Sequence, residues 1–277
     1  MSKLYLVGTP IGNLGDLSPR AVETLRSVDF IAAEDTRVTL KLLNRFEIST
    51  PMVSYYQHNL RERGEQIVAR MLSGEHCALV TDAGMPAISD PGEDLVCLCA
   101  QAGIEIVSVP GPSAATTALA LSGLNTSRFT FEGFISTNRQ SRRTHLEHLA
   151  HERRTMIFYE APHKLCATLK DLATTFGSER RIALCRELTK LHEEVIRTTL
   201  GSAVVRYTAP DAIAPRGEFV LVVDGAPEIA APAATLEQAV DLAQTLVSKG
   251  ESASTAAKQA AQQTGCKKGD IYRHLTQ

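Results

Sequence analysis

Residues 4–46 are LYLVGTPIGNLGDLSPRAVETLRSVDFIAAEDTRVTLKLLNRF, and their pattern decides the fold class. Short apolar runs at 4–7 and 30–33 predict strands, whereas 19–28 and 36–46 have the spacing of helices. Ser18 followed by proline is typical of a helix that begins with an N-cap and a proline in its first turn. Strands that alternate with helices in this way predict an α/β fold with a largely parallel sheet.

The same alternation continues to residue 121, and a second α/β set follows a change of pattern at 124–138. In this second set we expect a helix from Pro162 and strands at 156–159, 182–186, 195–200 and 219–223. The later strands predict a hairpin within a mixed sheet. We therefore expect an N-terminal α/β domain at 1–122 and a second α/β domain at 123–225.

A linker and a small helical extension are expected at 226–277. Alanine and proline are frequent at 225–235, which predicts an extended spacer. Helical patterns then follow at 235–248, 252–264 and 268–276, and the breaks between them fit the spacing of a helix-turn-helix. A helical tail packed on the body of the protein is the alternative.

Composition limits the class of protein. The chain has 277 residues, of which 44% are hydrophobic and 22% charged, as in ordinary globular proteins of two compact units. No run of about 18 apolar residues and no cleavable leader is visible, so we expect a cytoplasmic protein. A formal charge of −2 argues against a protein that coats nucleic acid through bulk positive charge, so any RNA contact must be local. The six cysteines form no C-x-x-C pair and predict reduced thiols.

Loops rich in glycine and proline follow three predicted strands, at 8–16, 81–92 and 109–114. None of them has the spacing G-x-G-x-x-G or G-x-x-x-x-G-K-[ST], which argues against dinucleotide binding and nucleotide hydrolysis. Open α/β sheets bind ligands at the carboxyl ends of their parallel strands. These loops therefore predict a ligand pocket, without indicating its chemistry.

Acidic and basic residues are mixed within single turns at 33–37, 159–164 and 186–194. Salt bridges and caps at element ends explain any one of these stretches, and their number favours a functional site. Histidines at 145, 148 and 151 recur every three residues, but no thiol or carboxylate partner has matching spacing. We therefore expect no metal.

Taken together, these stretches resemble the ribosomal RNA small-subunit methyltransferase I family, a branch of the tetrapyrrole methylases. The resemblance covers nearly the whole chain. The motifs that carry it are GTPIGN at 8–13, AEDTR at 33–37, TDAGMPAISDPG at 81–92, PGPSA at 110–114, FEGF at 131–134, YEAPH at 159–163, RELTKLHEE at 186–194 and RGEFVLVV at 216–223.

The resemblance implies a tetrapyrrole-methylase fold in which S-adenosylmethionine (SAM) lies in a cleft between the two α/β domains. It also implies 2′-O-methylation of a cytidine in the decoding region of 16S rRNA, with the small ribosomal subunit or its 16S rRNA as partner, and a homodimer. The cofactor contacts that it implies are Pro10, Gly84, Met85, Ile88, Ser89, Asp90, Ser113, Ala114, Tyr159, Ala214 and Pro215.

A ribose 2′-hydroxyl is a poor nucleophile at neutral pH, so a base or an orienting charge within hydrogen-bond reach should help. Asp35 and Arg37 are the candidates, and an ion pair that fixes the strand end is the alternative interpretation of the two. His58 and Glu160 are weaker candidates.

Two stretches depart from the family pattern in ways that concern RNA. The family has H-E-H-N-E where this chain has YQHNL at 56–60, and it has proline and lysine after G-F where this chain has ISTN at 135–138. Positive charge for phosphate contacts is predicted instead from nearby arginines and the last helical pattern, although solvated helix faces would show the same residues. The predicted RNA contacts are Arg139, Arg142, Arg143, Lys267 and Lys268.

Two other functions fit parts of the sequence. A methyltransferase of the same fold could act on a tetrapyrrole, with pocket arginines pairing with the substrate carboxylates. A non-catalytic RNA-binding module could act through its C-terminal helices.

Overall fold

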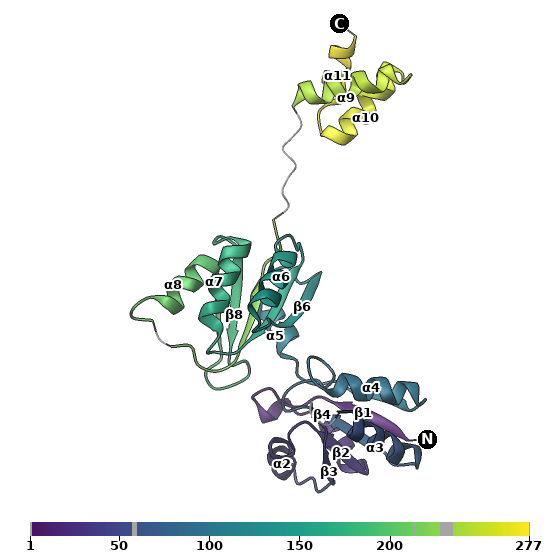
Figure 1. Cartoon of the computed structure of the whole chain (residues 1–277), viewed down its shortest axis with the longest axis vertical. Helices are drawn as coiled ribbons and strands as arrows, with labels where there is room; N and C mark the ends of the chain where they lie inside the picture. The colour runs from purple at the N-terminus through teal and green to yellow at the C-terminus, as the bar shows by residue number, and fades with distance from the viewer. Residues whose placement is uncertain (1, 57–59, 213, 228–234, 277) are drawn as a thin grey trace. The chain divides into compact units, whose positions relative to one another are not determined.

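A computed structural model describes residues 2–56, 60–212, 214–227 and 235–276. The chain forms two compact units, Met1–Ala226 and Pro227–Gln277, which are described separately. Figure 1 follows the chain by colour from the purple strands of a first sheet, through the green strands of a second, to the C-terminal helices in yellow.

The first sheet has five strands, all parallel, in the order β3-β2-β4-β1-β5. The strands are β1 (Lys3–Val7), β2 (Phe30–Ala33), β3 (Met52–Ser54), β4 (Cys77–Val80) and β5 (Glu105–Val109). The chain leaves the neighbouring strands β1 and β4 towards opposite edges of the sheet. From β1 it crosses to β2 on one side, and from β4 it crosses to β5 on the other. Open α/β sheets bind ligands beside such a switch point, at the carboxyl ends of the strands.

Helices cover both faces of this sheet. On one face, α1 (Pro19–Ser27) and α2 (Thr36–Arg45) pack in a cluster with Ile31 and Val80. On the other, α3 (Leu60–Leu72) and α4 (Gly92–Gln101) pack with Phe30 and Leu79. Because alternate residues of a strand point to opposite faces, strands buried on both sides have continuous apolar sequences. The predicted α/β fold with a parallel sheet is thus confirmed.

The second sheet is mixed, as the sequence predicts, with the strand order β6-β7-β10-β8-β9. Strands β6 and β7 are parallel, and the other neighbours are antiparallel, with β8 and β9 forming the expected hairpin. The strands are β6 (Phe129–Phe134), β7 (Thr155–Glu160), β8 (Arg181–Arg186), β9 (Glu194–Thr199) and β10 (Phe219–Val223).

Three helices, α6 (Arg139–Leu149), α7 (Leu165–Phe176) and α8 (Leu200–Thr208), contribute to the core on one face of the second sheet. The opposite face is covered by α5 (Ala114–Ser122), whose Ala115 and Ala118 pack with residues of β7, β8 and β10. Helix α5 precedes the expected boundary at residue 122, yet its apolar side belongs to the second sheet. By packing, the chain passes from the first sheet to the second at the loop 110–113.

The C-terminal unit consists of α9 (Leu236–Ser248), α10 (Ala253–Thr264) and α11 (Lys268–Leu275). Its core is built mainly of alanines, which let the helices approach closely, and Ile271 of α11 is fully buried among them. Thr235 and Gln238 form a capping box at the start of α9, and Gly265 ends α10 in the left-handed conformation. A short 3-10 turn, η1 (Leu14–Asp16), lies in the first unit. No helix among the described residues is long and apolar enough to span a membrane.

Candidate active site

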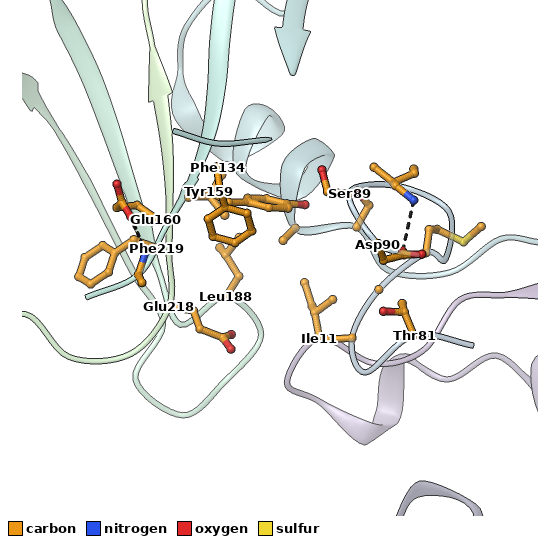
Figure 2. Close-up of a pocket in the computed structure, with 18 of the residues that line it drawn as sticks. Ile11, Thr81, Ser89, Asp90, Phe134, Tyr159, Glu160, Leu188, Glu218 and Phe219 are labelled. Atoms are coloured by element: carbon orange, nitrogen blue, oxygen red, sulfur yellow. Dashed lines mark hydrogen bonds between the residues drawn. The ribbon is translucent and has the colours of Figure 1, made fainter. Parts of the chain in front are cut away.

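A cavity of about 440 Å³ lies in the first unit, lined by residues from the ends of both sheets (Figure 2). Eight of the predicted cofactor contacts line it, namely Gly84, Met85, Ile88, Ser89, Asp90, Ser113, Ala114 and Tyr159. Residues that are far apart in sequence are therefore brought together where the parallel strands end. Cavities of this size hold small-molecule ligands.

The loop after β4 owes its shape to the carboxylate of Asp90. One carboxylate oxygen accepts hydrogen bonds from the backbone N–H groups of Ala87 (2.9 Å) and Gly92 (2.7 Å), and the other from Ile88 (3.3 Å). Ala87 and Ser89 adopt positive φ angles of 67° and 62°, which residues other than glycine rarely do. The charged hydrogen bonds of Asp90 offset that strain, so both oxygens of this carboxylate serve the loop.

The glycine loops after β1 and β5 touch backbone to backbone. A Cβ atom added to Gly8 would lie 2.6 Å from Cα of Gly111 and 2.8 Å from Sδ of Met85. Thr9 and Gly84 exchange two backbone hydrogen bonds of 2.9 and 3.1 Å, which joins the loop after β1 to the loop after β4. Glycine is needed at residue 8 because no side chain fits, and these contacts hold the loops after β1, β4 and β5 together at the ends of their strands.

The wall on the side of the second sheet is aromatic and apolar. The ring of Tyr159 makes edge-on contacts with Phe131 (5.0 Å between centroids) and Phe134 (5.5 Å). Leu188 adds to this wall. In the view of Figure 2, Phe134 and Tyr159 lie between Glu160 on one side and Ser89 on the other. Burial raises the pKa of Tyr159.

All charged side chains that line the cavity, within the described part of the chain, are acidic: Glu34, Asp90, Glu160 and Glu218. No lysine or arginine of the described ranges is among the lining residues. Carboxylates in a partly enclosed, low-dielectric site attract cations and repel anions. The cavity therefore favours a positively charged ligand over a phosphate or a polycarboxylate.

Glu34 enters the cavity from the end of β2. Its Oε2 accepts hydrogen bonds from the hydroxyl of Thr81 (2.6 Å) and from the backbone N–H of Asp82 (3.4 Å). Burial raises the pKa of Asp82, and the nearby charge of Glu34 raises it further. The ends of β2 and β4 thus carry two carboxyl groups close together.

Glu160 occupies the opposite end and is only 4% exposed. Its Oε1 accepts from the N–H of Ala161 (2.9 Å), and its Oε2 accepts from the hydroxyl of the fully buried Thr168. The Thr168 oxygen in turn accepts from Nη2 of Arg142 (2.9 Å), whose Nε donates to Asp171 (2.5 Å). A chain of hydrogen bonds therefore connects the cavity wall to α6.

The predicted catalytic pair lies outside the cavity lining. Asp35 is the N-cap of α2, with its Oδ1 accepting from the backbone N–H (2.8 Å) and Nε (3.0 Å) of Arg37 and its Oδ2 accepting from Nη2 (2.6 Å). Hydrogen bonds from Arg37 lower the pKa of Asp35 to about 2. The arrangement has the features of the alternative, an ion pair at the strand end, and Asp35 also caps the helix that begins there. His58, a weaker candidate, lies outside the described residues.

Three of the predicted cofactor residues also lie away from this cavity. Pro10 is not among its lining residues. Ala214 and Pro215 instead line a second cavity of about 520 Å³, together with Arg186, Arg206 and Arg216. Ala214 and Pro215 lie in the segment before β10. Phe219, the first residue of β10, lines both cavities.

The predicted RNA contacts differ in their availability. Arg139 and Arg143 are exposed on α6, although Arg143 pairs with Glu147 (2.7 Å). The Arg142 side chain is only 15% exposed and is held by Asp171 and Thr168, so it is not presented to solvent as a phosphate contact would require. Arg142 lies on the inward face of α6. The predicted contact of this residue with RNA phosphates is therefore corrected, and Arg139 and Arg143 do not form one basic surface with it.

Lys267 and Lys268 are exposed at the start of α11, where Nζ of Lys268 donates to Ser254 (3.2 Å). One of the three regularly spaced histidines, His145, has a partner within the protein. Its Nε2 lies 3.0 Å from a carboxylate oxygen of Glu132. Within the described ranges, no three or more His, Cys, Asp or Glu side chains group as a metal ion would require.

Sequence reasoning missed several residues of the cavity. Those not proposed are Ile11, Glu34, Thr81, Ala83, Phe134, Ala161, Pro162, Cys185, Leu188, Glu218, Phe219 and Val220. All but Cys185 lie within the motifs that carry the family resemblance, so the motifs marked the right segments without showing which of their residues face the cavity. Which residues of a motif reach the cavity, such as Leu188 and Phe219, depends on tertiary packing, for which no local signal exists.

Comparisons with known proteins show the family of the chain. Residues 3–204 match the family model of the Tetrapyrrole (Corrin/Porphyrin) Methylases. A protein of Synechocystis sp. is 49% identical over 273 residues, which covers 99% of this chain and 97% of the relative, and its name is Ribosomal RNA small subunit methyltransferase I. The chain belongs to the tetrapyrrole methylases and, within them, to the ribosomal RNA small subunit methyltransferase I family.

A second member of that methyltransferase family, from Bacillus subtilis, is 45% identical and covers 98% of this chain and 93% of its own length. Solved structures share the tetrapyrrole-methylase fold at lower identity. The uroporphyrin-III-C-methyltransferase of Thermus thermophilus aligns with a TM-score of 0.56 at 19% identity, covering 80% of this chain and 94% of that one. A cobalt precorrin-4 methyltransferase aligns with a TM-score of 0.57 at 18% identity, covering 79% and 94%. The predicted fold and family are therefore confirmed.

Proposed function

We propose that this methyltransferase moves a methyl group from SAM to a ribose 2′-hydroxyl of 16S rRNA, at a cytidine of the decoding region. The observation that carries the proposal is the acidic cavity at the switch point of the parallel sheet, because it suits a cationic cofactor. Relatives that share nearly half of their residues with this chain are named ribosomal RNA methyltransferases, which supports RNA as the substrate.

The residues present fit SAM in charge and in shape. The four lining carboxylates together give the cavity a negative potential that suits a sulfonium and an ammonium group, while a flat adenine finds the aromatic wall at Tyr159 and Phe134. The cavity of about 440 Å³ lies within the range of small-molecule sites. When bound, the cofactor supplies an already activated methyl group.

The chain itself then has to orient two reactants and exclude water, which is how enzymes convert a bimolecular step into a nearly unimolecular one. The loop held by Asp90 and the glycine contact at Gly8 fix one side of the cofactor site. Leu188 and Tyr159 provide an apolar opposite side that keeps water out. Asp35 and Arg37 stay candidates for the catalytic pair, and methyl transfer by an Asp35→Asn variant tests the acid of that pair.

For RNA we propose that only the target nucleoside enters, because the acidic lining repels phosphates. The phosphates would contact exposed cations elsewhere on the chain, for which Arg139, Arg143, Lys267 and Lys268 are the candidates. A chain ending at Ala226, where the first compact unit ends, tests the C-terminal helices. If that chain binds small subunits as tightly as the full chain, the RNA contact assigned to Lys267 and Lys268 is wrong.

The acidic cavity counts against the tetrapyrrole alternative. Tetrapyrrole substrates carry several carboxylates, which basic side chains would have to pair with. The described residues lining this cavity supply none.

The test is to incubate the purified protein with SAM labelled in its methyl group and with small ribosomal subunits that lack the modification. Label mapped to a ribose of one decoding-region cytidine supports the proposal. Label on a tetrapyrrole and none on rRNA refutes it in favour of the small-molecule alternative, and failure to bind SAM at all favours the non-catalytic module. Free 16S rRNA in a parallel reaction decides which form of the substrate is used, and size determination by light scattering tests the proposed homodimer.

A further inference from the structure

The proposed reaction needs a group that takes the proton of the ribose hydroxyl, and the cavity offers four carboxylates. This inference rests on the proposed function. The hydrogen bonds of each carboxylate decide which of them has an oxygen available, because an ionised carboxylate acts as a base only through a lone pair that points at the substrate.

Two of the four are committed through both carboxylate oxygens, and a third lies mostly in solvent. Both oxygens of Asp90 accept backbone N–H groups of its own loop. Both oxygens of Glu160 are taken, one by Ala161 and one by the buried Thr168. Glu218 is bonded through Oε2 alone, to Nζ of Lys190 at 2.9 Å, but its side chain is 79% exposed, so water solvates the other oxygen and the carboxylate is not held in one position.

Glu34 differs from Asp90 and Glu160 in having one open oxygen, and from Glu218 in being half-buried and held by two hydrogen bonds. Both hydrogen bonds to its carboxylate, from Thr81 and from the N–H of Asp82, go to the same oxygen, Oε2. No other described residue hydrogen-bonds to Oε1, and Glu34 lines the cavity. The carboxylate is therefore anchored through one oxygen and open through the other, as a positioned base should be.

We propose that Glu34 is the catalytic base of the methyl transfer and that Thr81 is its positioning residue. In this step the O–H bond of the ribose 2′-hydroxyl breaks and its proton passes to Oε1 of Glu34. The ribose oxygen forms a bond to the methyl carbon, while the bond from that carbon to sulfur breaks and its electron pair stays on sulfur. The products are a 2′-O-methyl ribose, a neutral thioether and a protonated Glu34, which returns its proton to water.

The neighbouring pair Asp35 and Arg37 does not meet the same requirement. Arg37 donates to both carboxylate oxygens of Asp35, and the pair lies outside the cavity lining. The two adjacent acids at the end of β2 thus divide the work: Asp35 caps α2, and Glu34 faces the cavity. Asp82 donates its N–H to Glu34 and accepts the N–H of Asp35 at 3.1 Å, so it fixes both.

The experiment compares Glu34→Gln with Asp35→Asn, using single-turnover methyl transfer to small ribosomal subunits at saturating SAM. Glu34→Gln keeps the size of the side chain and removes its basicity, so we expect transfer to slow by about 10²- to 10⁴-fold. Binding of SAM and of S-adenosylhomocysteine, measured by calorimetry, should change by no more than about fivefold, as for the loss of one partly exposed charge. Glu65→Gln, an exposed acid on α3 that pairs with Arg61 at 3.6 Å, is the matched control and should behave as the wild type.

The role of Thr81 is tested in the same assay. Thr81→Val removes the hydroxyl that holds Oε2 and keeps the shape of the side chain, whereas Thr81→Ser keeps the hydroxyl. We expect Thr81→Val to slow transfer by about tenfold at unchanged SAM affinity, in keeping with the loss of one hydrogen bond to a charged group, and Thr81→Ser to restore it. A merely structural role would lower thermal stability in step with activity.

Three results would overturn the assignment. The first is transfer by Glu34→Gln within about threefold of the wild type. The second is a loss of SAM affinity that equals the loss of rate, which would make Glu34 a cofactor ligand. The third is a large loss in Asp35→Asn with little in Glu34→Gln. Should Glu34→Gln fail to fold, Glu34→Asp keeps the charge but withdraws it by one methylene, and an undiminished rate there counts equally against the proposal. If the wild-type protein labels no rRNA, the proposed function itself is refuted. The assignment of Glu34 as its catalytic base is then refuted as well.

Discussion

A single methyl group at Gly8 should disturb the cofactor site more than the stability of the protein. In the Gly8→Ala variant the new Cβ would lie 2.6 Å from Cα and 2.8 Å from N of Gly111, and 2.8 Å from Sδ of Met85. Ordinary contacts between carbon atoms are about 3.5–4.0 Å. The loop after β1 and the loop after β5 must therefore separate by roughly 1 Å, since two of the three obstructing atoms belong to the backbone.

Overpacking of this kind costs about 1–3 kcal/mol of unfolding free energy. For a unit of this size each kcal/mol lowers the melting temperature by about 2–4 °C, so a decrease of roughly 2–12 °C is expected. A displacement of about 1 Å in an active site can cost about 100-fold in activity. We therefore expect a fold that survives with SAM binding and methyl transfer largely lost.

The assay is differential scanning calorimetry together with SAM titration, with Gly269→Ala as control. Gly269 lies on α11, where an added Cβ would meet nothing within 4 Å, so the same substitution should leave SAM binding unchanged. Wild-type SAM affinity in Gly8→Ala would refute the reasoning, because it would mean that the loops around Gly111 do not shape the cofactor site.

Three further predictions concern the carboxylates. Asp90→Asn removes the charge of the carboxylate that accepts three backbone N–H groups, and hydrogen bonds to charged groups contribute about 1.5–3 kcal/mol. SAM affinity measured by calorimetry should therefore fall about 10- to 100-fold. The secondary structure seen by circular dichroism should stay unchanged. Thr168→Val leaves the buried Glu160 without its hydroxyl donor and should lower the free energy of unfolding in urea by about 1–3 kcal/mol. Thr168→Ser keeps the hydroxyl and should unfold close to the wild type. Equal unfolding midpoints for the two variants would contradict this. Hydrogen bonds from Arg154 lower the pKa of Glu152 from 4.5 to about 2, so the stability that Glu152 contributes is complete above pH 4.5 and lost as the pH falls towards 2. Between pH 4.5 and 2 the Glu152→Gln variant should therefore lose less unfolding free energy than the wild type, by up to about 1 kcal/mol after screening by solvent. Identical acid unfolding curves for the variant and the wild type would exclude the contribution.

The sequence predicts the elements well where the pattern is local. The strands at 30–33 and 219–223 have the expected bounds, and the three C-terminal helices begin and end within one residue of the predicted ones. These segments carry strong signals, such as a continuous apolar run or the Thr235 cap, which depend on residues a few positions apart. The helix α5 shows the limit, because nothing within 114–122 indicates that its apolar face packs on the second sheet.

The candidate site shows the same limit at the level of single atoms. Loop motifs at 81–92 and 110–114 predict residues that gather around one cavity, since parallel strands must end at the same edge of their sheet. Asp35 and Glu34 are adjacent in sequence, and the choice between them depends on which one reaches the hydroxyl of Thr81, 47 positions away. A local signal for the role of Asp35 did exist, because Asp before a helical pattern is a common N-cap.

Arg142 illustrates why charge in the sequence does not equal charge at the surface. It stands among the exposed Arg139 and Arg143, but the helical period turns it inward onto Thr168 and Asp171. Its charge therefore holds a wall of the cavity in place and is not offered to phosphates.

Net charge hides a comparable separation on the scale of the whole chain. The formal charge of −2 argues only against uniform binding of a polyanion. Locally, one cavity is lined by four carboxylates, whereas a second cavity that shares Phe219 with it is lined by three arginines and by the acids Glu194 and Asp211, with two of the arginines pairing with Glu194 at 3.6 and 3.2 Å. Among the described residues, the charges that line the first cavity have a single sign and favour a cation, whereas acids partly balance the arginines of the second. The sign of each cavity, more than the total charge, therefore decides which reactant it can hold.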